Sequence, residues 1–236
     1  MSTVAILPPK ENILTPPPMT SKQMSYEEFL RWADEDTHAE WINGEVIEFM
    51  PAKPIHQSIS YFLVHLLGYF NDLFRLGQIR FAPMEMRLRG GRSSRKPDIL
   101  FIKQANLHRL NENRLEGPAD LVIEIVSDDS VTRDRRDKLK EYQEAGITEY
   151  WIIDPRPGKL RADFYRLNEA GQYELFGLDE DERVESQVLP GFWLRPQWLW
   201  QSDTLNPMQI FGEIIGLPDN FISQLRQASN SQESAS

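Results

Sequence analysis

The sequence predicts a mixed α/β fold of the α+β kind, in which helices flank a mixed β-sheet. Two patterns support this prediction. From Pro54 to about Arg75, large apolar residues recur at three- and four-residue steps, which is typical of a long helix with one buried face. Farther along, the apolar runs Ala119–Val126 and Glu149–Ile153 enclose a helical segment, and such a crossover nearly always joins parallel strands.

The first 22 residues contain proline clusters and no apolar periodicity, which indicates a flexible arm ahead of the folded domain. Ser25 and Glu28 then form the capping-box pattern that starts a short helix. The segment from Trp41 to Phe49 is predicted to be an N-terminal hairpin that turns at Asn43-Gly44, because this pair readily adopts the positive φ angles of a tight turn.

Two further strands are expected before the crossover. Met84 to Arg89 alternates apolar and charged residues, like a half-exposed strand. Pro97 to Ile102 is a short apolar run bounded by turn residues, as in a buried strand. The crossover helix is expected to follow the helix-capping residues after Val126 and to end at Gly146, because glycine commonly ends a helix.

Beyond the crossover, Leu160–Leu167 and Gln172–Phe176 predict a C-terminal β-hairpin extension packed against the main sheet. The aromatic residues around Trp198 are typical of a core or an oligomer contact, and the alternative is a surface on which bases stack. We therefore expect a flexible arm at 1–22, a main domain at 23–203, and a C-terminal extension with a disordered tail at 204–236.

The composition indicates a soluble protein of a reducing compartment. Of the 236 residues, 40% are hydrophobic and 26% are charged, which suits a packed core under a hydrated surface. The absence of cysteine excludes disulfides, thiolate nucleophiles and cysteine-ligated metal sites. Because no apolar run is long enough for a membrane span and the N-terminus lacks a signal-peptide pattern, we expect a cytoplasmic protein.

The net charge of −10 argues against a protein that binds nucleic acid over its whole surface, since phosphate affinity comes from clustered Lys and Arg. Two local basic clusters nevertheless flank the acidic residues discussed next, and the alternative is that they are ordinary solvated faces. The clusters are Arg87, Arg89, Arg92, Arg95 and Lys96, and Arg133, Arg135, Arg136, Lys138 and Lys140.

Two carboxylates occupy unusual places. Asp98 opens an apolar strand, and Glu124 lies within a run of Leu, Val and Ile where an unpaired charge would cost several kcal/mol. An ion pair with an arginine would explain either carboxylate alone. Together, two carboxylates from adjacent strands can hold one hard cation such as Mg²⁺, and the carbonyl of Ile125 is placed to add a third oxygen.

Lys138 follows Glu124 on the predicted helix, from which its ammonium could reach a metal-bound water or a phosphate. Without the carboxylates, a solvated helix face would be the simpler interpretation of Lys138. His56, near the start of the long helix, is a lesser candidate, because a structural histidine is the commoner case.

Several ordered segments resemble the Uma-two family of restriction endonucleases, over about residues 22 to 200. The segments include Glu40-Trp41-Ile42-Asn43-Gly44-Glu45 followed by His56, then Pro97-Asp98, and then Glu124-Ile125-Val126-Ser127. They continue with Lys138 four residues before Tyr142, with Ala145-Gly146-Ile147, with Glu149 to Pro155, and with Leu189-Pro190-Gly191-Phe192.

The family belongs to the PD-(D/E)XK nuclease group, so the resemblance implies a restriction-endonuclease-like mixed sheet flanked by helices. It further implies that Asp98 and Glu124 are metal ligands, and that Glu40 is a further acidic residue beside the metal. The wider group has lysine two residues after the second carboxylate, where this chain has Val126. The resemblance suggests that Lys138 takes over that role.

The expected function is a Mg²⁺-dependent endonuclease, with Mn²⁺ as a substitute, that hydrolyses phosphodiester bonds of nucleic acid, in the first place DNA. The proposed residues are Asp98, Glu124, Lys138 and Glu40, with the metal on Asp98, Glu124 and Ile125. A homodimer is expected by analogy with nucleases that cut two strands. The alternatives are a non-catalytic nucleic-acid-binding or assembly module with the same fold, and a two-carboxylate glycosidase.

Overall fold

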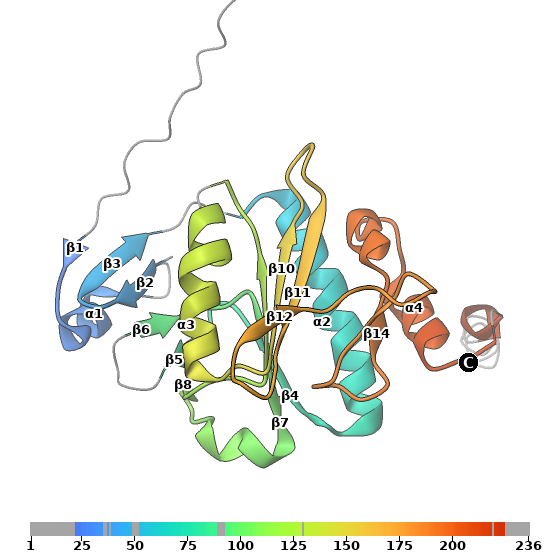
Figure 1. The fold of residues 1–236 in the computed structure, drawn as a ribbon, viewed down its shortest axis with the longest axis horizontal. Helices are drawn as coiled ribbons and strands as arrows, with labels where there is room; N and C mark the ends of the chain where they lie inside the picture. The colour runs from blue at the N-terminus through green and yellow to red at the C-terminus, as the bar shows by residue number, and fades with distance from the viewer. Residues whose placement is uncertain are drawn as a thin grey trace, which may run out of the picture.

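The computed structural model describes residues 22–34, 37, 39–48, 52–88, 93–128, 130–218 and 220–224. It contains two six-stranded mixed sheets flanked by helices, so the predicted mixed α/β class is confirmed (Figure 1). The predicted arm, apart from Lys22, and the polar tail after residue 224 lie outside the described residues. The division into an arm, a main domain and an extension stays a prediction.

The first sheet contains the predicted N-terminal hairpin. Its turn at Asn43 (φ 50°) and Gly44 (φ 91°) has the positive φ angles that the Asn-Gly pair predicts. Helix α1 (Tyr26–Trp32) begins at the predicted capping box of Ser25 and Glu28. The order of strands in this sheet is β1 (Lys22–Gln23), β3 (Glu45–Glu48), β2 (Ala39–Ile42), β6 (Ser93–Arg95), β5 (Glu85–Arg87) and β8 (Arg114–Glu116).

The second sheet is the centre of the molecule. Its strands β9 and β10 are parallel and are joined by a helix, as the crossover pattern predicts, and the other neighbouring pairs are antiparallel. The predicted C-terminal hairpin forms the last two strands at one edge of this sheet. The order is β12 (Tyr173–Leu175), β11 (Arg161–Leu167), β10 (Glu149–Asp154), β9 (Leu121–Ile125), β7 (Ile99–Lys103) and β4 (Gly77–Phe81).

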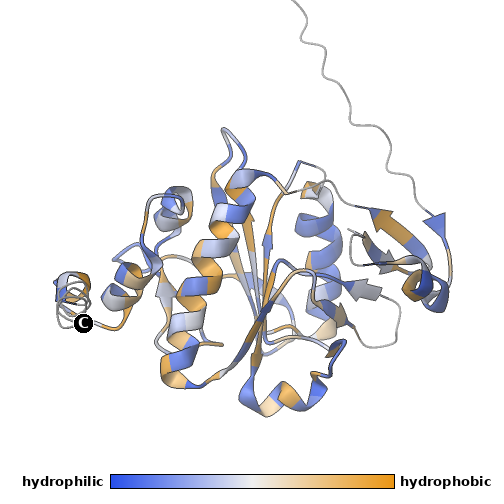
Figure 2. Ribbon diagram, turned by 180° about the vertical axis from the view of Figure 1, so that it is seen from behind, coloured by the Kyte–Doolittle hydropathy of each residue, from blue (hydrophilic) through white to orange (hydrophobic). Residues whose placement is uncertain are grey.

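Helices cover both faces of the second sheet. Helix α2 (Pro54–Phe74) lies on one face and helix α3 (Lys138–Ala145) on the other, as the front view of Figure 1 and the rear view of Figure 2 show. Alternate residues of β9 face opposite sides, so Ile123 packs in the core under α2 while Val122 packs in the core under α3. Glu124 shares the side of Val122 and therefore faces α3.

The short elements at the C-terminal end close the core beside α2. They comprise a strand pair β13 (Val184–Glu185) and β14 (Trp193–Leu194), a 3₁₀-helix η3 (Pro196–Gln201) and helix α4 (Pro207–Ile214). Another 3₁₀-helix, η1 (Gln104–Arg109), lies in the middle of the chain and follows β7. Phe192 and Trp198 are buried in this core, and Trp193 and Trp200 pack against it. The core interpretation of the aromatic segment is confirmed.

The edge strand β4 approaches β7 so closely that Gly77 has no room for a side chain. A Cβ on Gly77 would lie 2.0 Å from the carbonyl oxygen of Ile102. We expect Gly77→Ala to lower the free energy of unfolding by about 1–3 kcal/mol, since backbone must move. Urea unfolding measures this, with Gly68→Ala in α2 as control. Nothing lies within 4 Å of a Cβ there, so a gain of up to about 1 kcal/mol is expected, and equal effects would contradict the prediction.

Candidate active site

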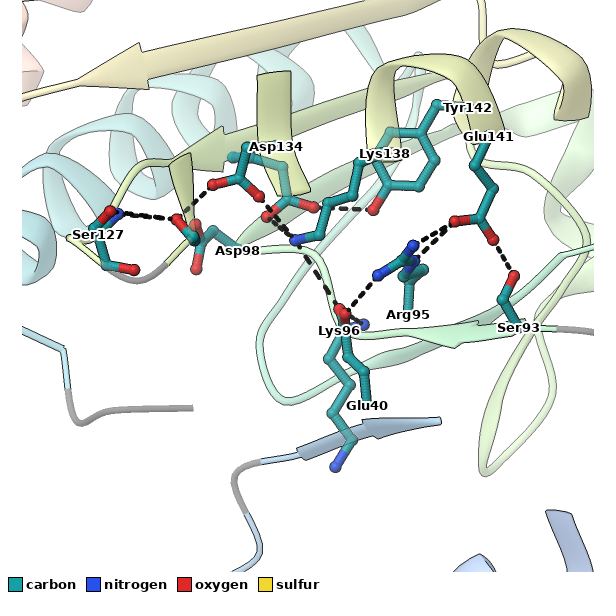
Figure 3. A network of polar contacts seen from close by, with 12 residues as sticks. Glu40, Ser93, Arg95, Lys96, Asp98, Ser127, Asp134, Lys138, Glu141 and Tyr142 are labelled. Carbon is teal, nitrogen blue, oxygen red and sulfur yellow. Dashed lines mark hydrogen bonds and ion pairs between the residues drawn. The ribbon is translucent and has the colours of Figure 1, made fainter. Parts of the chain in front are cut away.

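The structure brings together the predicted residues Asp98, Glu124, Lys138 and Glu40 at the junction of the two sheets and α3. Ile99 of β7 pairs with Ile123 of β9 in an antiparallel register, so Asp98 lies beside Glu124 across the strands. Lys138 is the first residue of α3, and Glu40 comes from β2 in the first sheet. Figure 3 shows Glu40 and Asp134 reaching the Lys138 ammonium, with Asp98 to one side.

Glu124 is 3% exposed and is the fourth of the five residues of strand β9. Its Oε2 lies 2.9 Å from Lys138 Nζ, and its Oε1 accepts a hydrogen bond of 2.8 Å from the Tyr142 hydroxyl. Burial raises the pKa of Glu124 to about 8, against the attraction of Lys138, and Asp134 adds to the rise. The direct partners of this carboxyl group are therefore Lys138 and Tyr142 of α3, and neither is an arginine.

Lys138 is buried and faces three carboxylates. Its Nζ lies 2.9 Å from Glu124, 3.1 Å from Asp134 Oδ1 and 3.9 Å from Glu40 Oε1. Burial disfavours the ammonium, but the charges of Asp134 and Glu124 hold the pKa of Lys138 well above its usual range. The solvated-face interpretation of Lys138 is thus wrong, because its side chain is 5% exposed.

Glu40 is held by groups of the first sheet. Arg95 donates a hydrogen bond of 2.9 Å to Glu40 Oε2, and the backbone N–H of Lys96 donates one of 2.8 Å to Oε1. Burial alone would raise the pKa of Glu40, but the charges of Lys138 and Arg95 hold it at about 2. Glu40 is therefore a permanent anion beside Lys138.

Asp98 lies at the more open edge of the site, with a side chain 20% exposed. The backbone N–H of Ile125 donates a 2.7 Å hydrogen bond to its Oδ2, and His56 Nε2 lies 3.1 Å from its Oδ1. Burial alone would lower the pKa of His56, but the contact with Asp98 raises it above its usual value. The lesser candidate His56 thus lies within the site.

Two residues of the site, Arg95 and Asp134, were not predicted as site residues from the sequence. Arg95 of β6 is buried and bridges Glu40 and Glu141, with a 2.9 Å hydrogen bond from its Nε to Glu141. Asp134 contacts Lys138 from the turn before α3. These residues stand in polar stretches of sequence that look solvated, so only the spacing of four residues between Asp134 and Lys138, which suits a helical ion pair, could have indicated one of them.

The basic clusters are engaged mainly within the protein. Arg95 and Lys138 are buried in the site, and Arg135 pairs with Asp154 and Asp163. Arg136 and Lys140 are exposed beside acidic neighbours, while Arg89 and Arg92 lie outside the described residues. These cations therefore serve first to neutralise carboxylates of the fold.

The donor set at the junction fits a hard divalent cation. Asp98 and Glu124 offer carboxylate oxygens from neighbouring strands, and Ile125 adds a carbonyl next to Glu124, which are the ligand types that Mg²⁺ prefers. The carboxyl groups of Glu40, Glu124 and Asp134 share Lys138, whereas Asp98 pairs with His56. Within the described residues, no group of three or more His, Asp or Glu side chains is placed to hold a metal ion.

The Tyr142 hydroxyl is expected to stabilise the buried Glu124 carboxyl. Replacing Tyr142 with phenylalanine removes the donor of the 2.8 Å hydrogen bond and leaves a buried acceptor unpaired. We expect the free energy of unfolding to fall by about 1–3 kcal/mol, measured in urea. Tyr61→Phe on α2, where the ring is 60% exposed, is the matched control. A Tyr142→Phe variant as stable as this control would contradict the assigned bond.

Among the described helices, none has both the length and the apolar character that a membrane crossing requires. No curated protein matches the chain. Among solved structures, the chain is similar to a protein from Anabaena variabilis ATCC 29413 described as a "putative nuclease belonging to DUF820". The identity is 20%, the TM-score is 0.61, and the match covers 75% of this chain and 97% of the other, which shows a shared fold.

The profile of the Uma2 family, described as "Putative restriction endonuclease", matches residues 26–197. The matched region contains every residue of the site, from Glu40 to Tyr142. The fold shared with the solved structure agrees with this match. The chain belongs to the Uma2 family of nuclease-like proteins.

Proposed function

We propose that the protein is a Mg²⁺-dependent endonuclease that hydrolyses phosphodiester bonds, with DNA as its substrate and Mn²⁺ as a substitute metal. The observation that carries this proposal is the placement of two carboxyl groups, Asp98 and Glu124, on neighbouring strands of the second sheet. Glu124 contacts Lys138, and Asp98 stands at the more exposed edge, where a cation and a substrate could enter. A divalent cation bound between the two groups would favour their charged forms.

Asp98, Glu124 and the Ile125 carbonyl would hold the metal. When bound, Mg²⁺ supplies Lewis acidity that lowers the pKa of a bound water and stabilises charge on a phosphate. Lys138 acts as a donor and not as a base, because its raised pKa keeps the ammonium charged. It therefore orients the attacking water and stabilises developing negative charge. Glu40, through its contacts with Lys138 and Arg95, fixes these cations.

The homodimer is also a proposal, and so is the alternative function as a non-catalytic module. A homodimer would supply two sites for the two strands of a duplex. One observation favours a non-catalytic module instead: both oxygens of Glu124 already have protein partners, Lys138 and Tyr142. A carboxylate oxygen has two lone pairs, however, so each can accept a hydrogen bond and still bind a metal.

A cleavage screen tests the proposed function. The protein is incubated with labelled plasmid, single-stranded DNA and RNA, with Mg²⁺, with Mn²⁺ and with EDTA. We expect metal-dependent cleavage of DNA that EDTA abolishes. Cleavage of RNA alone would contradict the proposed substrate, and undiminished cleavage in EDTA would contradict the metal requirement. Absence of cleavage in all arms would favour the binding module.

A further inference from the structure

The turn between β9 and α3 has an unusual backbone. Residues Arg133–Asp137 form one π-helical turn, η2, which leads directly into α3 at Lys138. A π-turn is wider than an α-turn, is rarer, and is frequently found at functional sites. Here it carries Asp134, which is 1% exposed and faces Lys138 four residues later.

Asp134 is tied to the sheet and to the loop after β9. The Ser130 hydroxyl donates a 2.5 Å hydrogen bond to Asp134 Oδ2, and Ser130 Oγ in turn accepts a 2.9 Å bond from the backbone N–H of Ser127. The Tyr150 hydroxyl of β10 donates a 2.9 Å hydrogen bond to the backbone carbonyl of Asp134. One oxygen of the carboxylate is thus anchored, and the other is directed at Lys138.

Lys138 is held in place by ion pairs with carboxyl groups on two sides. Its Nζ lies 2.9 Å from Glu124 Oε2 and 3.1 Å from Asp134 Oδ1, with Glu40 Oε1 farther away at 3.9 Å. Asp134 Oδ1 is buried and accepts no hydrogen bond, so its contact with Lys138 is an ion pair. A flexible four-carbon stem does not by itself fix an ammonium. Asp134 supplies the second fixed contact that Glu124 alone cannot give.

We propose that Asp134 is a positioning residue, which holds the Lys138 ammonium in place by ion pairing so that it faces the reacting water. This inference rests on the proposed nuclease function. This chain has Val126 at the position where the wider nuclease group has a lysine, and the strand itself would hold a lysine at that position. The π-turn and Asp134 give a helix lysine the fixed position that the strand would otherwise provide.

The rival explanation is that Asp134 only stabilises the fold as part of a buried ion pair. The two explanations differ in how the Asp134 and Lys138 substitutions combine. A residue that acts through Lys138 has no further effect on catalysis once Lys138 is gone, whereas an independent effect adds to it.

The test compares Asp134→Asn, Lys138→Met and the double variant by steady-state cleavage kinetics in Mg²⁺. We expect Asp134→Asn to lower kcat by about 10–100-fold with KM changed less than about twofold, and the double variant to match Lys138→Met. Asp120→Asn is the matched control, because Asp120 is a buried aspartate at the start of β9 that accepts bonds from Lys103 N and Asn106. This control is expected to keep wild-type kcat.

Ser130→Ala provides a second variant in case Asp134→Asn does not fold, since it removes the anchor of Asp134, together with the acceptor for Ser127 N–H, and keeps the charge of Asp134. We expect a smaller loss of kcat, again absent in the Lys138→Met background. Wild-type kcat in the Asp134 and Ser130 variants, or effects that multiply with that of Lys138→Met, would overturn the inference while leaving the nuclease function in place. A wild-type protein that cleaves no substrate would overturn both.

Discussion

Replacing Glu124 with glutamine is expected to lower the rate of metal-dependent cleavage by at least about 10³-fold, since a lost metal ligand removes several kcal/mol of charge stabilisation. The fold should survive. Glutamine has the shape of the protonated carboxyl that burial favours, it can keep the contact with Tyr142, and Lys138 retains Asp134 as a partner. Single-turnover cleavage and near-ultraviolet circular dichroism measure the two expectations.

Glu149→Gln is the matched control for this experiment. Glu149 is a buried glutamate of the neighbouring strand β10, and it accepts hydrogen bonds from Ser186 Oγ at 2.9 Å and from Val188 N at 3.1 Å. It therefore holds a loop and has no contact with the site. Cleavage by Glu124→Gln at the rate of this control would show that the carboxylate has no part in the reaction.

Replacing Lys138 with methionine is expected to destabilise the protein by about 3–5 kcal/mol at neutral pH, because buried carboxylates lose their shared counterion. Glu40 and Asp134 are 1% exposed, so water cannot replace the ammonium. Urea unfolding measures the loss. Lys140→Met, two residues farther along the same helix, is the control, since Lys140 is 78% exposed and its removal should leave stability unchanged.

The loss of stability caused by Lys138→Met is also expected to depend on pH, through the carboxyl groups of Glu40 and Glu124. In the wild type, the pKa of Glu40 is lowered to about 2 from 4.5, so its contribution to stability is present above 4.5 and is lost as the pH falls towards 2. The pKa of Glu124 is raised to about 8, so its contribution is full below 4.5 and is lost as the pH rises through 8.

Without Lys138, the pKa values of these carboxyl groups rise, and protonation removes the unpaired charge. The difference in stability between Lys138→Met and the wild type should therefore shrink as the pH is lowered from 8 to 5. A difference that is constant over this range, or that grows on acidification, would show that the cost of the substitution is lost packing and not unpaired charge.

Much of the fold could be predicted because its elements carry strong local patterns. The periodic apolar face of α2, the Asn43-Gly44 turn and the apolar strands of the crossover each specify their structure locally. Strand β6, with the sequence Ser93-Ser94-Arg95, was not predicted, because its burial arises from contacts with β2 and β5 and not from its own residues. The division into two sheets likewise depends on distant pairings.

Some residues of the candidate site could likewise be predicted from the sequence, and others could not. Glu124 stands out because a charge within an apolar strand is costly, and the register of β7 and β9 places Asp98 beside it. Arg95 and Asp134 carry no such signal, since each lies in a polar stretch and is buried only by the folded chain. The π-turn that aligns Asp134 with Lys138 has no sequence pattern as distinct as a capping box.

The central claim is that Asp98 and Glu124 form a divalent-cation site, and calorimetric titration of the protein with Mg²⁺ and with Mn²⁺ tests it most directly. We expect one cation per chain in the wild type and loss of that binding in both Asp98→Asn and Glu124→Gln, with Glu149→Gln binding like the wild type. A wild-type protein that binds neither cation, or variants that bind them as tightly as the wild type, would contradict the account.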